Sequence, residues 1–541
     1  MKFDLIIRNA TVVDGRGAPA FEADVALADG RIASVGVPAD AWAVEELEAA
    51  GMVLCPGFID SHSHADLSLL TQGLEDEKLR MGVTTEIIGQ CGYSAFPVDD
   101  RHRGLRADTM SGFLPGIRLP WDWSTLDDYR AACTRIGLTH NIVSLAGHGS
   151  IRVAVMGDRA EAPKAGELDR MRHLVRQAME MGAFGLSTGL IYPPACYAEP
   201  SEIEALCRVV AEFGGVHVTH VRGETADLVD AAVEEALEIS FASGVALQIS
   251  HLKVIGLHRR NRGKVKSVIA RIEAARRAGL EVNFDCYPYT EGSTLLSTLV
   301  PRWAQVQGVS GLVARLGNPE DRAKIRRDIE TDTPGWENWA NACGLDAVKI
   351  AALNRGRSDP IVGMDLAAVG RLRGTDPIEA LFDIIVAEQA NAMMVFSMMT
   401  EEDMLTALCH PLGMIGTDAI PCPPGQGRPH PRGYGAFPRI LGRLVRGTGV
   451  IALEEAVRKM TSLPAQKFGL RDRGHVAVGM HADLVIFDPS RIIDQATYEA
   501  PRRPPSGIKA VIVNGRPMLS GAIVSPHRPG MFLEPSKQET A

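Results

Sequence analysis

The sequence predicts an α/β fold, a TIM-like (β/α)8 barrel with a small β-sandwich domain formed by both chain ends. Three observations support this prediction. Short apolar strands alternate with helical stretches through the middle of the chain, as in parallel βαβ units. Both ends are instead rich in strand patterns separated by Asp-Gly and Asn-Gly turns. Histidines, a cysteine and an aspartate follow several middle strands, at the end where barrel active sites form.

The two chain ends share this β-rich texture. Residues 4–13 form an apolar strand pattern, and Asp29-Gly30 separates two shorter strands as a type I′ hairpin turn would. Short strand patterns followed by an Asn-Gly turn also occur near the C-terminus. We therefore expect one small β-sandwich domain from residues 1–55 and 475–541, with two isolated sheets as the alternative.

The middle of the chain, residues 56–474, is expected to form the barrel. Helical stretches at 225–243 and 264–278 separate strands there, so neighbouring strands should run parallel. Residues from about 290 to 360 are rich in Gly, Pro, Trp and charge, which predicts an insertion or lid. Nine strand candidates compete for eight barrel positions, and one of the last three is surplus: 53–59, 84–89, 141–146, 183–187, 216–220, 245–251, 282–287, 393–396 and 414–416.

Composition and charge exclude several classes of protein. The 541 residues are 45% hydrophobic and carry a formal charge of −9, whereas nucleic-acid binding usually needs a basic surface. No apolar run reaches the roughly 18 residues of a membrane span, and the first four residues lack a signal-peptide pattern. Nine cysteines occur singly, as in reduced proteins. We expect a cytoplasmic protein without nucleic-acid or membrane partners, and a homo-oligomer stays open.

Six side chains at strand ends form a candidate metal site. The first two are histidines two residues apart after an apolar strand, so they share a face and can approach one ion. The other four follow later strands, where a barrel gathers its functional groups at one mouth. The six residues are His62, His64, Cys91, His220, His251 and Asp418.

Thiolate and imidazole ligands together suit zinc. A catalytic zinc ion keeps one position for water and lowers the pKa of that water to about 7. Asp418 is the candidate general base; it could instead be a metal ligand, and both roles can hold at different steps. Among the other histidines, His148 could line the site, His430 is a weaker candidate, and we interpret His410 as structural.

Longer motifs surround these residues: PGFIDSHSH at 56–64, QCG at 90–92, STGLIYPP at 187–194, THVR at 219–222, ISH at 249–251, YPYT at 287–290, GRPHPR at 427–432 ahead of FPR at 437–439, and GMHADLV at 479–485. Together they resemble the D-aminoacylase, or N-acyl-D-amino-acid deacylase, family of the amidohydrolase superfamily. The resemblance covers nearly the whole chain and implies a barrel of the amidohydrolase type.

The resemblance also implies roles for individual residues. Many related enzymes bridge two metals with a carbamylated lysine on the fourth strand, but residues 183–189 offer no lysine, and Cys91 matches the cysteine that replaces it. The implied ligands of a tight zinc ion are Cys91, His220 and His251, and those of a second, weak site are His62, His64 and Asp418. The implied grip on a substrate carboxylate comes from Lys253, Tyr287, Ser293 and Arg432.

The chain also departs from the family. The loop at 419–426 is atypical. Members that act on acidic substrates place an arginine shortly after the serine matching Ser293, whereas residues 294–299 read TLLSTL and Arg302 lies further on, which favours an apolar substrate side chain. We therefore expect zinc-dependent hydrolysis of N-acyl-D-amino acids. A cyclic-amide hydrolase of the hydantoinase or dihydroorotase type and a non-catalytic amidohydrolase-like scaffold are the alternatives.

Overall fold

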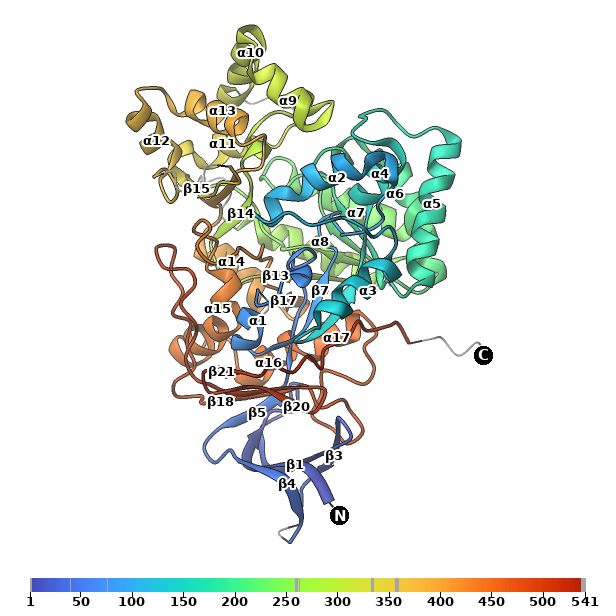
Figure 1. Ribbon diagram of the computed structural model, residues 1–541, viewed down its shortest axis with the longest axis vertical. Coiled ribbons are helices and arrows are strands. Elements are labelled where there is room, and N and C mark those ends of the chain that lie inside the picture. Colours follow the sequence, from blue (N-terminus) through green and yellow to red (C-terminus); the bar gives the residue numbers. More distant parts are fainter. Residues whose placement is uncertain are drawn as a thin grey trace.

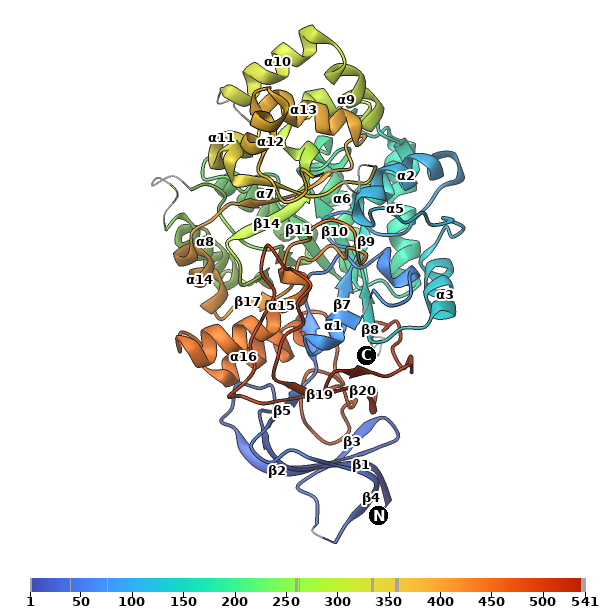
Figure 2. The same ribbon diagram turned by 60° about the vertical axis from the view of Figure 1, so that its left-hand side comes forward.

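The computed structural model describes residues 2–38, 40–74, 76–257, 261, 263–331, 335–355 and 360–536. The expected insertion and C-terminal segment include residues that lie outside these ranges, namely 332–334, 356–359 and 537–541. Strands from the chain ends lie at the bottom of Figures 1 and 2, the barrel elements occupy the middle, and a group of helices lies at the top. Within the described ranges, no helix combines the length and apolar character needed to cross a membrane.

The two chain ends form one hydrogen-bonded sheet. Its order is β21-β20-β19-β18-β5-β1-β2-β3, with β4 beside β1. Cys55 of β5 pairs with Val485 of β18, so the N-terminal and C-terminal strands are joined, and the alternative of two isolated sheets is wrong. Side chains from both ends share a core that includes Leu54 and Ile486. The strands are β1 (Lys2–Val12), β2 (Phe21–Ala28), β3 (Arg31–Val35), β4 (Trp42–Glu48), β5 (Val53–Pro56), β18 (Leu484–Phe487), β19 (Ile508–Val513), β20 (Arg516–Ser520) and β21 (Ile523–Val524).

The expected hairpin turn between β2 and β3 is present. Asp29 and Gly30 have φ angles of +51° and +75°, the left-handed conformation that a type I′ turn requires. The domain boundaries expected at 55/56 and 474/475 stay predictions.

The described middle of the chain supplies eight parallel strand positions. They form two hydrogen-bonded runs, β6-β7-β8 and β9-β10-β11-β12-β13-β17. Only Leu145 separates β8 from β9, and its N–H donates to Ile88 O at 3.0 Å, so the two pieces form one position. Ser61 N donates to Ile415 O at 3.2 Å, which joins the first position to the last. The strands are β6 (Phe58–Asp60), β7 (Val83–Ile88), β8 (Asn141–Ser144), β9 (Ala146–Gly147), β10 (Gly185–Gly189), β11 (Val216–His220), β12 (Ala246–Ile249), β13 (Val282–Cys286) and β17 (Gly413–Ile415).

The first expected strand, 53–59, is divided between two sheets. Its first half is β5 of the terminal sheet, and its second half begins β6 of the barrel. Gly57 separates them, and a Cβ atom there would lie 2.1 Å from the Thr84 hydroxyl. Glycine therefore lets the chain pass between the two sheets at a point where β7 approaches closely.

Helices cover the barrel and close its lower end. Phe468, just after α17, belongs to one apolar cluster with Ile59, Ile87, Val143 and Val218 of the strands. Side chains therefore fill the barrel interior on the side away from the carboxyl ends of the strands. The expected helices at 225–243 and 264–278 correspond to α7 and α8. The helices of this part are α1 (Asp76–Arg80), α2 (Arg103–Met110), α3 (Leu126–Ile136), α4 (His148–Met156), α5 (Ala165–Glu180), α6 (Pro200–Glu212), α7 (Val229–Ser243), α8 (Lys264–Arg277), α14 (Glu401–Cys409), α15 (Arg432–Arg439), α16 (Leu453–Met460) and α17 (Ser462–Lys467).

A long excursion lies between β13 and α14 and forms the top of Figures 1 and 2. Its three strands form the antiparallel sheet β14-β16-β15, so the surplus strand candidate is 393–396. The excursion therefore continues past the residue near 360 at which we expected it to end. Its elements are β14 (Glu291–Leu295), η6 (Leu296–Leu299), η7 (Arg302–Gln305), α9 (Gly308–Leu316), α10 (Pro319–Glu330), α11 (Trp339–Cys343), β15 (Val348–Ala352), α12 (Leu366–Arg373), α13 (Pro377–Ala387) and β16 (Met393–Ser397).

Candidate metal centre and substrate pocket

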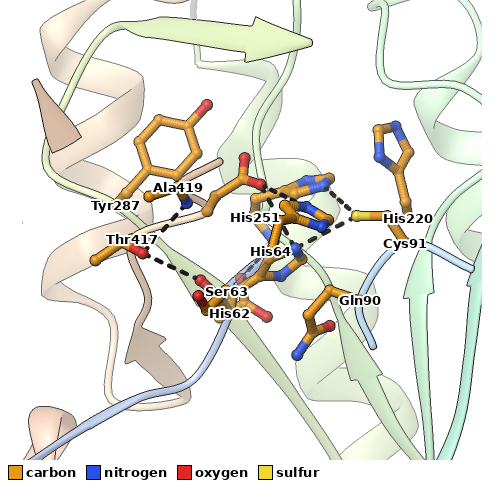
Figure 3. Close-up of polar contacts among 12 residues, drawn as sticks. His62, Ser63, His64, Gln90, Cys91, His220, His251, Tyr287, Thr417 and Ala419 are labelled. Atoms are coloured by element: carbon orange, nitrogen blue, oxygen red, sulfur yellow. Dashed lines mark hydrogen bonds and ion pairs between the residues drawn. The ribbon is translucent and has the colours of Figure 1, made fainter. Parts of the chain in front are cut away.

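Six polar side chains meet at the carboxyl ends of the parallel strands, and each of these residues is at most 8% exposed. Figure 3 labels the histidines and the cysteine among them. Two follow β6, one follows β7, one ends β11, and the last two follow β12 and β17. In that order they are His62, His64, Cys91, His220, His251 and Asp418, the complete set expected for the metal site.

The Cys91 thiol lies at the centre of this cluster. Its Sγ atom is 3.3 Å from His62 Nε2 and 3.4 Å from His251 Nε2. Asp418 Oδ1 is 3.2 Å from His64 Nε2 and 3.6 Å from His62 Nε2. Three groups have ligand atoms within 4.8 Å of one another, and two of them share the thiol: Cys91 with His220 and His251, Cys91 with His62 and His64, and Asp418 with His62 and His251.

The donor chemistry of the cluster fits zinc. His220 is buried, yet neither of its ring nitrogens has a hydrogen-bond partner, although Nε2 lies 3.4 Å from a Glu224 carboxylate oxygen. Buried polar atoms normally form hydrogen bonds, so an imidazole that forms none and lies beside a thiol and a carboxylate fits a metal ligand. Sulfur with imidazole nitrogen is the mixture that zinc accepts in tetrahedral sites.

Three residues of the cluster have unusual backbone conformations. Cys91, His251 and Asp418 have φ angles of +52°, +35° and +49°. Residues other than glycine rarely adopt such angles, and they concentrate at functional sites where the surrounding structure enforces them. Here the turns just after β7, β12 and β17 direct three side chains toward the same point.

Electrostatics keep the thiol and the carboxylate ionised. Burial alone would raise the pKa of the Cys91 thiol, but the imidazoles of His62 and His251 outweigh burial and hold that pKa well below its usual value. Burial also opposes ionisation of Asp418, yet the Arg432 guanidinium and His251 hold its pKa well below its usual range. Both groups are therefore anions that can bind a cation or accept a proton.

Asp285 is a functional residue that we did not predict from the sequence. It lies on β13, where Oδ1 accepts a hydrogen bond from the backbone N–H of His251 at 2.8 Å and lies 3.1 Å from the ring atom Nδ1 of His62. A carboxylate behind a ligating imidazole fixes the orientation of the ring. The available signal was an acid inside one of the expected barrel strands, Val282–Cys286.

Glu224 is a second residue that we did not predict. Its Oε1 atom accepts a hydrogen bond from Lys253 Nζ at 2.7 Å and lies 3.1 Å from His251 Nδ1. Lys253, expected to face the substrate, does line the pocket, but its ammonium is held in this ion pair. The position of Glu224 four residues after His220 was the available signal.

Arg432 is buried beside the candidate base. Its Nη1 donates to Asp418 Oδ2 at 2.8 Å, and its Nη2 donates to the Ser293 carbonyl at 3.2 Å. The guanidinium also lies over the Tyr287 ring, 4.7 Å from its centroid. The Ser293 hydroxyl donates to Met394 O at 2.8 Å, so the backbone of this serine, rather than its hydroxyl, faces the guanidinium.

A pocket of about 430 Å³, the metal pocket, connects the cluster with Lys253, Tyr287 and Ser293. Arg432 lines a neighbouring cavity and reaches the metal pocket through its contacts with Asp418 and Ser293. Its other walls are largely apolar or aromatic. The lining residues beyond the cluster are Tyr93, Phe113, Tyr192, Glu224, Lys253, Tyr287, Gly292, Ser293, Thr294, Trp339, Phe396, Met398 and Ile420. Excursion residues therefore cover the barrel mouth.

The remaining histidines considered from the sequence lie outside this pocket's lining. His148 Nε2 is 2.8 Å from Glu202 in a buried ion pair, so the expectation that it could line the metal pocket is wrong. His410 stacks on Phe284, consistent with a structural role. His430 accepts a hydrogen bond from the Arg432 N–H at 3.0 Å and so supports the start of α15.

Comparison with known proteins agrees with this geometry. The model of the amidohydrolase family matches residues 45–519. The N-acyl-D-glutamate deacylase of Alcaligenes xylosoxydans xylosoxydans is 35% identical, over 98% of this chain and 96% of that protein. The D-aminoacylase of the same organism is 35% identical, over 95% of this chain and 94% of its own.

Solved structures give the same relationship. The N-acyl-D-glutamate deacylase of Bordetella bronchiseptica, complexed with zinc and a phosphonate mimic of the tetrahedral intermediate, superposes with a TM-score of 0.84. It is 33% identical and covers 99% of this chain and 100% of its own. A D-hydantoinase, 14% identical with a TM-score of 0.53, shares the fold alone. The chain belongs to the amidohydrolase family and is a metal-dependent hydrolase of the D-aminoacylase type.

Proposed function

We propose that this protein is a zinc-dependent deacylase that cleaves the amide bond of N-acyl-D-amino acids, giving a carboxylate and a free D-amino acid. One observation carries the proposal: a thiolate, four imidazoles and a carboxylate converge in a buried pocket that also holds Lys253, Tyr287 and Ser293. Relatives named for this reaction match over nearly the whole chain.

Two adjacent ligand sets support zinc as the cofactor. Cys91, His220 and His251, whose ligand atoms lie within 4.8 Å of one another, would hold the tight ion. His62 and His64, at 3.6 and 3.2 Å from Asp418 Oδ1, would frame a second, weak site with that carboxylate. When bound, zinc supplies Lewis acidity that polarises a carbonyl and activates water. Asp285 and Glu224 orient the imidazoles from behind.

Asp418 is the proposed base. Its carboxylate faces the histidine cluster through Oδ1 and is anchored by Arg432 through Oδ2. In that position it can take the proton of the attacking water and then deliver it to the leaving nitrogen. The anchoring guanidinium keeps the carboxylate ionised until the proton arrives.

The proposed grip on the α-carboxylate involves Arg432, Lys253, Tyr287 and Ser293. Arg432 and Lys253 supply positive charge, and each already has an acidic partner, Asp418 and Glu224 respectively. A substrate carboxylate would share these cations, because a guanidinium has five N–H donors and an ammonium three. Fixing the carboxylate, the acyl carbonyl and the side chain gives the three contacts needed to distinguish D from L.

An apolar side chain is the proposed preference. The metal pocket is walled by Phe113, Phe396, Met398 and Ile420. Arg302, the arginine nearest in sequence to Ser293 on its C-terminal side, donates to the Arg222 carbonyl at 2.9 Å and does not line the pocket. An acidic side chain would therefore be buried beside apolar groups without a dedicated partner, which is costly.

The alternatives have less support. A cyclic-amide hydrolase would be expected to carry the bridging lysine, and β10 reads GLSTG. A non-catalytic scaffold would have no need for a buried set of six ligand residues. The proposal further takes a small N-acyl amino acid as the partner and the cytoplasm as the location.

A substrate panel tests the proposal. Zinc-loaded enzyme is assayed with N-acetyl derivatives of leucine, methionine and glutamate in both hands, and with hydantoin and dihydrouracil. We expect turnover of the D-leucine and D-methionine derivatives, weak turnover of D-glutamate, and none of the L forms. Ring opening of hydantoin or dihydrouracil without deacylation would instead support the cyclic-amide hydrolase.

A further inference from the structure

A second cavity, the apolar hollow, lies against the metal pocket. It holds about 680 Å³ of empty space between α9 of the excursion and helices α2 and α4 of the barrel layer. The lining residues are Tyr93, Leu105, Thr109, Val153, Asp158, Tyr192, Pro193, Pro194, Leu295, Ser297, Thr298, Gln305, Gly308, Val309, Leu312, Ala390 and Asn391.

The two cavities share a wall of aromatic side chains. Tyr93 and Tyr192 line both, and their ring centroids are 5.4 Å apart. The Tyr192 hydroxyl lies 3.1 Å from the Thr294 hydroxyl, while the next residue, Leu295, faces the hollow. The sequence motif at 187–194 contains none of the proposed catalytic or metal-binding residues, and its C-terminal part forms this wall.

The inside of the hollow suits hydrocarbon. Several of its polar side chains are turned to the backbone: Gln305 donates to Val300 O and Thr109 to Leu105 O, both at 2.8 Å. Its charged lining residue is Asp158, whose carboxylate would repel a second anion. Among the described residues that line it there is no lysine, arginine or histidine. The hollow therefore has no cationic side chain to pair with a carboxylate. It favours an apolar part of a ligand, whose transfer out of water is favourable.

The position of the hollow matches one end of the substrate. Tyr192 packs edge-on against His220, with ring centroids 5.2 Å apart. Tyr287, of the proposed carboxylate grip, lies on the other side of the cluster from His220 in Figure 3. With the carboxylate toward Tyr287 and the scissile carbonyl at the cluster, the acyl group points toward Tyr192.

The hollow also opens outward. Leu105, Val309 and Asn391 line both the hollow and a wider outer cavity. A chain that enters past the tyrosine wall therefore need not end inside the protein.

We propose that the apolar hollow is an acyl-chain subsite, so that the enzyme prefers N-acyl-D-amino acids with acyl chains of about six to eight carbons over N-acetyl substrates. This inference rests on the proposed deacylase function. Each methylene that leaves water raises kcat/KM by about fourfold, equivalent to about 0.8 kcal/mol. The hexanoyl substrate should then exceed the acetyl substrate by on the order of 10²-fold.

The test compares N-acetyl-, N-hexanoyl- and N-octanoyl-D-leucine on zinc-loaded wild type and on variants that fill the hollow. Val309→Trp enters from α9, and Leu105→Trp enters from α2. We expect each to lower kcat/KM for the two longer substrates by tenfold or more and to change N-acetyl turnover by less than about twofold. Val313→Trp is the matched control, because Val313 is on the same helix, half-buried like Val309, and lines neither cavity.

Wild-type rates that stay level or fall with chain length, alongside good N-acetyl turnover, would overturn the subsite and leave the deacylase function intact. Absence of turnover with all three substrates would overturn both. The ratio of N-acetyl-D-leucine to N-acetyl-D-alanine turnover should not change in Val309→Trp. A changed ratio would assign the hollow to the amino-acid side chain and refute the acyl assignment.

Discussion

Replacing Arg432 with alanine separates two functions that the structure gives to one guanidinium. Arg432 donates to the carboxylate of the proposed base. It is also one of the residues that we propose to bind the substrate carboxylate. A charge-assisted hydrogen bond contributes roughly 1.5–3 kcal/mol, or about 10- to 150-fold in kcat/KM. The variant loses both contacts with an N-acyl-D-amino acid, but only the contact with Asp418 when the substrate is the methyl ester.

The expected loss in kcat/KM is therefore on the order of 10²-fold or more for N-acetyl-D-leucine and about tenfold for its methyl ester. Steady-state kinetics on both substrates gives the ratio directly. Arg439→Ala is a matched control: it lies on the same helix, 4.7 Å over the Tyr289 ring, and pairs with Asp494 instead of Asp418. That variant should keep the wild-type ratio of acid to ester turnover.

Equal losses on the acid and the ester would refute this reasoning. They would mean that Arg432 acts on the substrate only through Asp418, or through the fold. The pH dependence of kcat separates these two. Loss of the guanidinium raises the pKa of Asp418 and so shifts the acid limb of the profile to higher pH, whereas an effect through the fold alone leaves that limb in place.

Three further substitutions test the metal centre. Cys91→Ala should lose bound zinc, measured by elemental analysis, because the substitution removes a thiolate ligand. The control variant Cys286→Ala should keep its zinc. Full zinc content in Cys91→Ala would disprove the ligand assignment. Asp418→Asn should retain zinc in the tight site and lose about 10²–10⁴-fold in kcat, measured at saturating substrate; wild-type turnover would move the base elsewhere. Glu224→Gln should weaken zinc binding by about 10- to 100-fold in competition with a chelator, and unchanged affinity would show that orienting His251 contributes nothing.

The metal ligands could be predicted from the sequence because their placement is local. Each follows a short apolar strand, and parallel strands of a barrel carry their ends to one mouth, so strand position alone predicted that His62, Cys91 and His251 would meet. Asp285 and Glu224 were missed for the opposite reason. Their function depends on which ring nitrogen they face, and that contact joins separate strand ends.

The fold shows the same division between local and long-range information. The Asp29-Gly30 turn follows from backbone preference within a few residues. The segment 393–396 is a short apolar run, and its hydrogen-bond partners decide whether it joins a parallel barrel or an antiparallel sheet. Its partners, β14 and β15, lie about 100 and 45 residues earlier, in a segment without clear periodicity.

Charge in the metal pocket explains why a divalent cation and an anionic substrate belong together. When the imidazoles are neutral, as metal ligands must be, the cluster holds two cations, Lys253 and Arg432. The carboxylates at 224, 285 and 418 and the Cys91 thiolate then outnumber them. An N-acyl amino acid adds another negative charge, which an uncompensated anionic pocket would repel. A zinc ion offsets this excess negative charge, so the guanidinium and ammonium can attract the substrate carboxylate although each is paired with a protein carboxylate. Cofactor binding and carboxylate recognition are therefore linked through the same set of charges, and retention of both cations beside the ligands is a physical argument for an acidic substrate over a neutral cyclic amide.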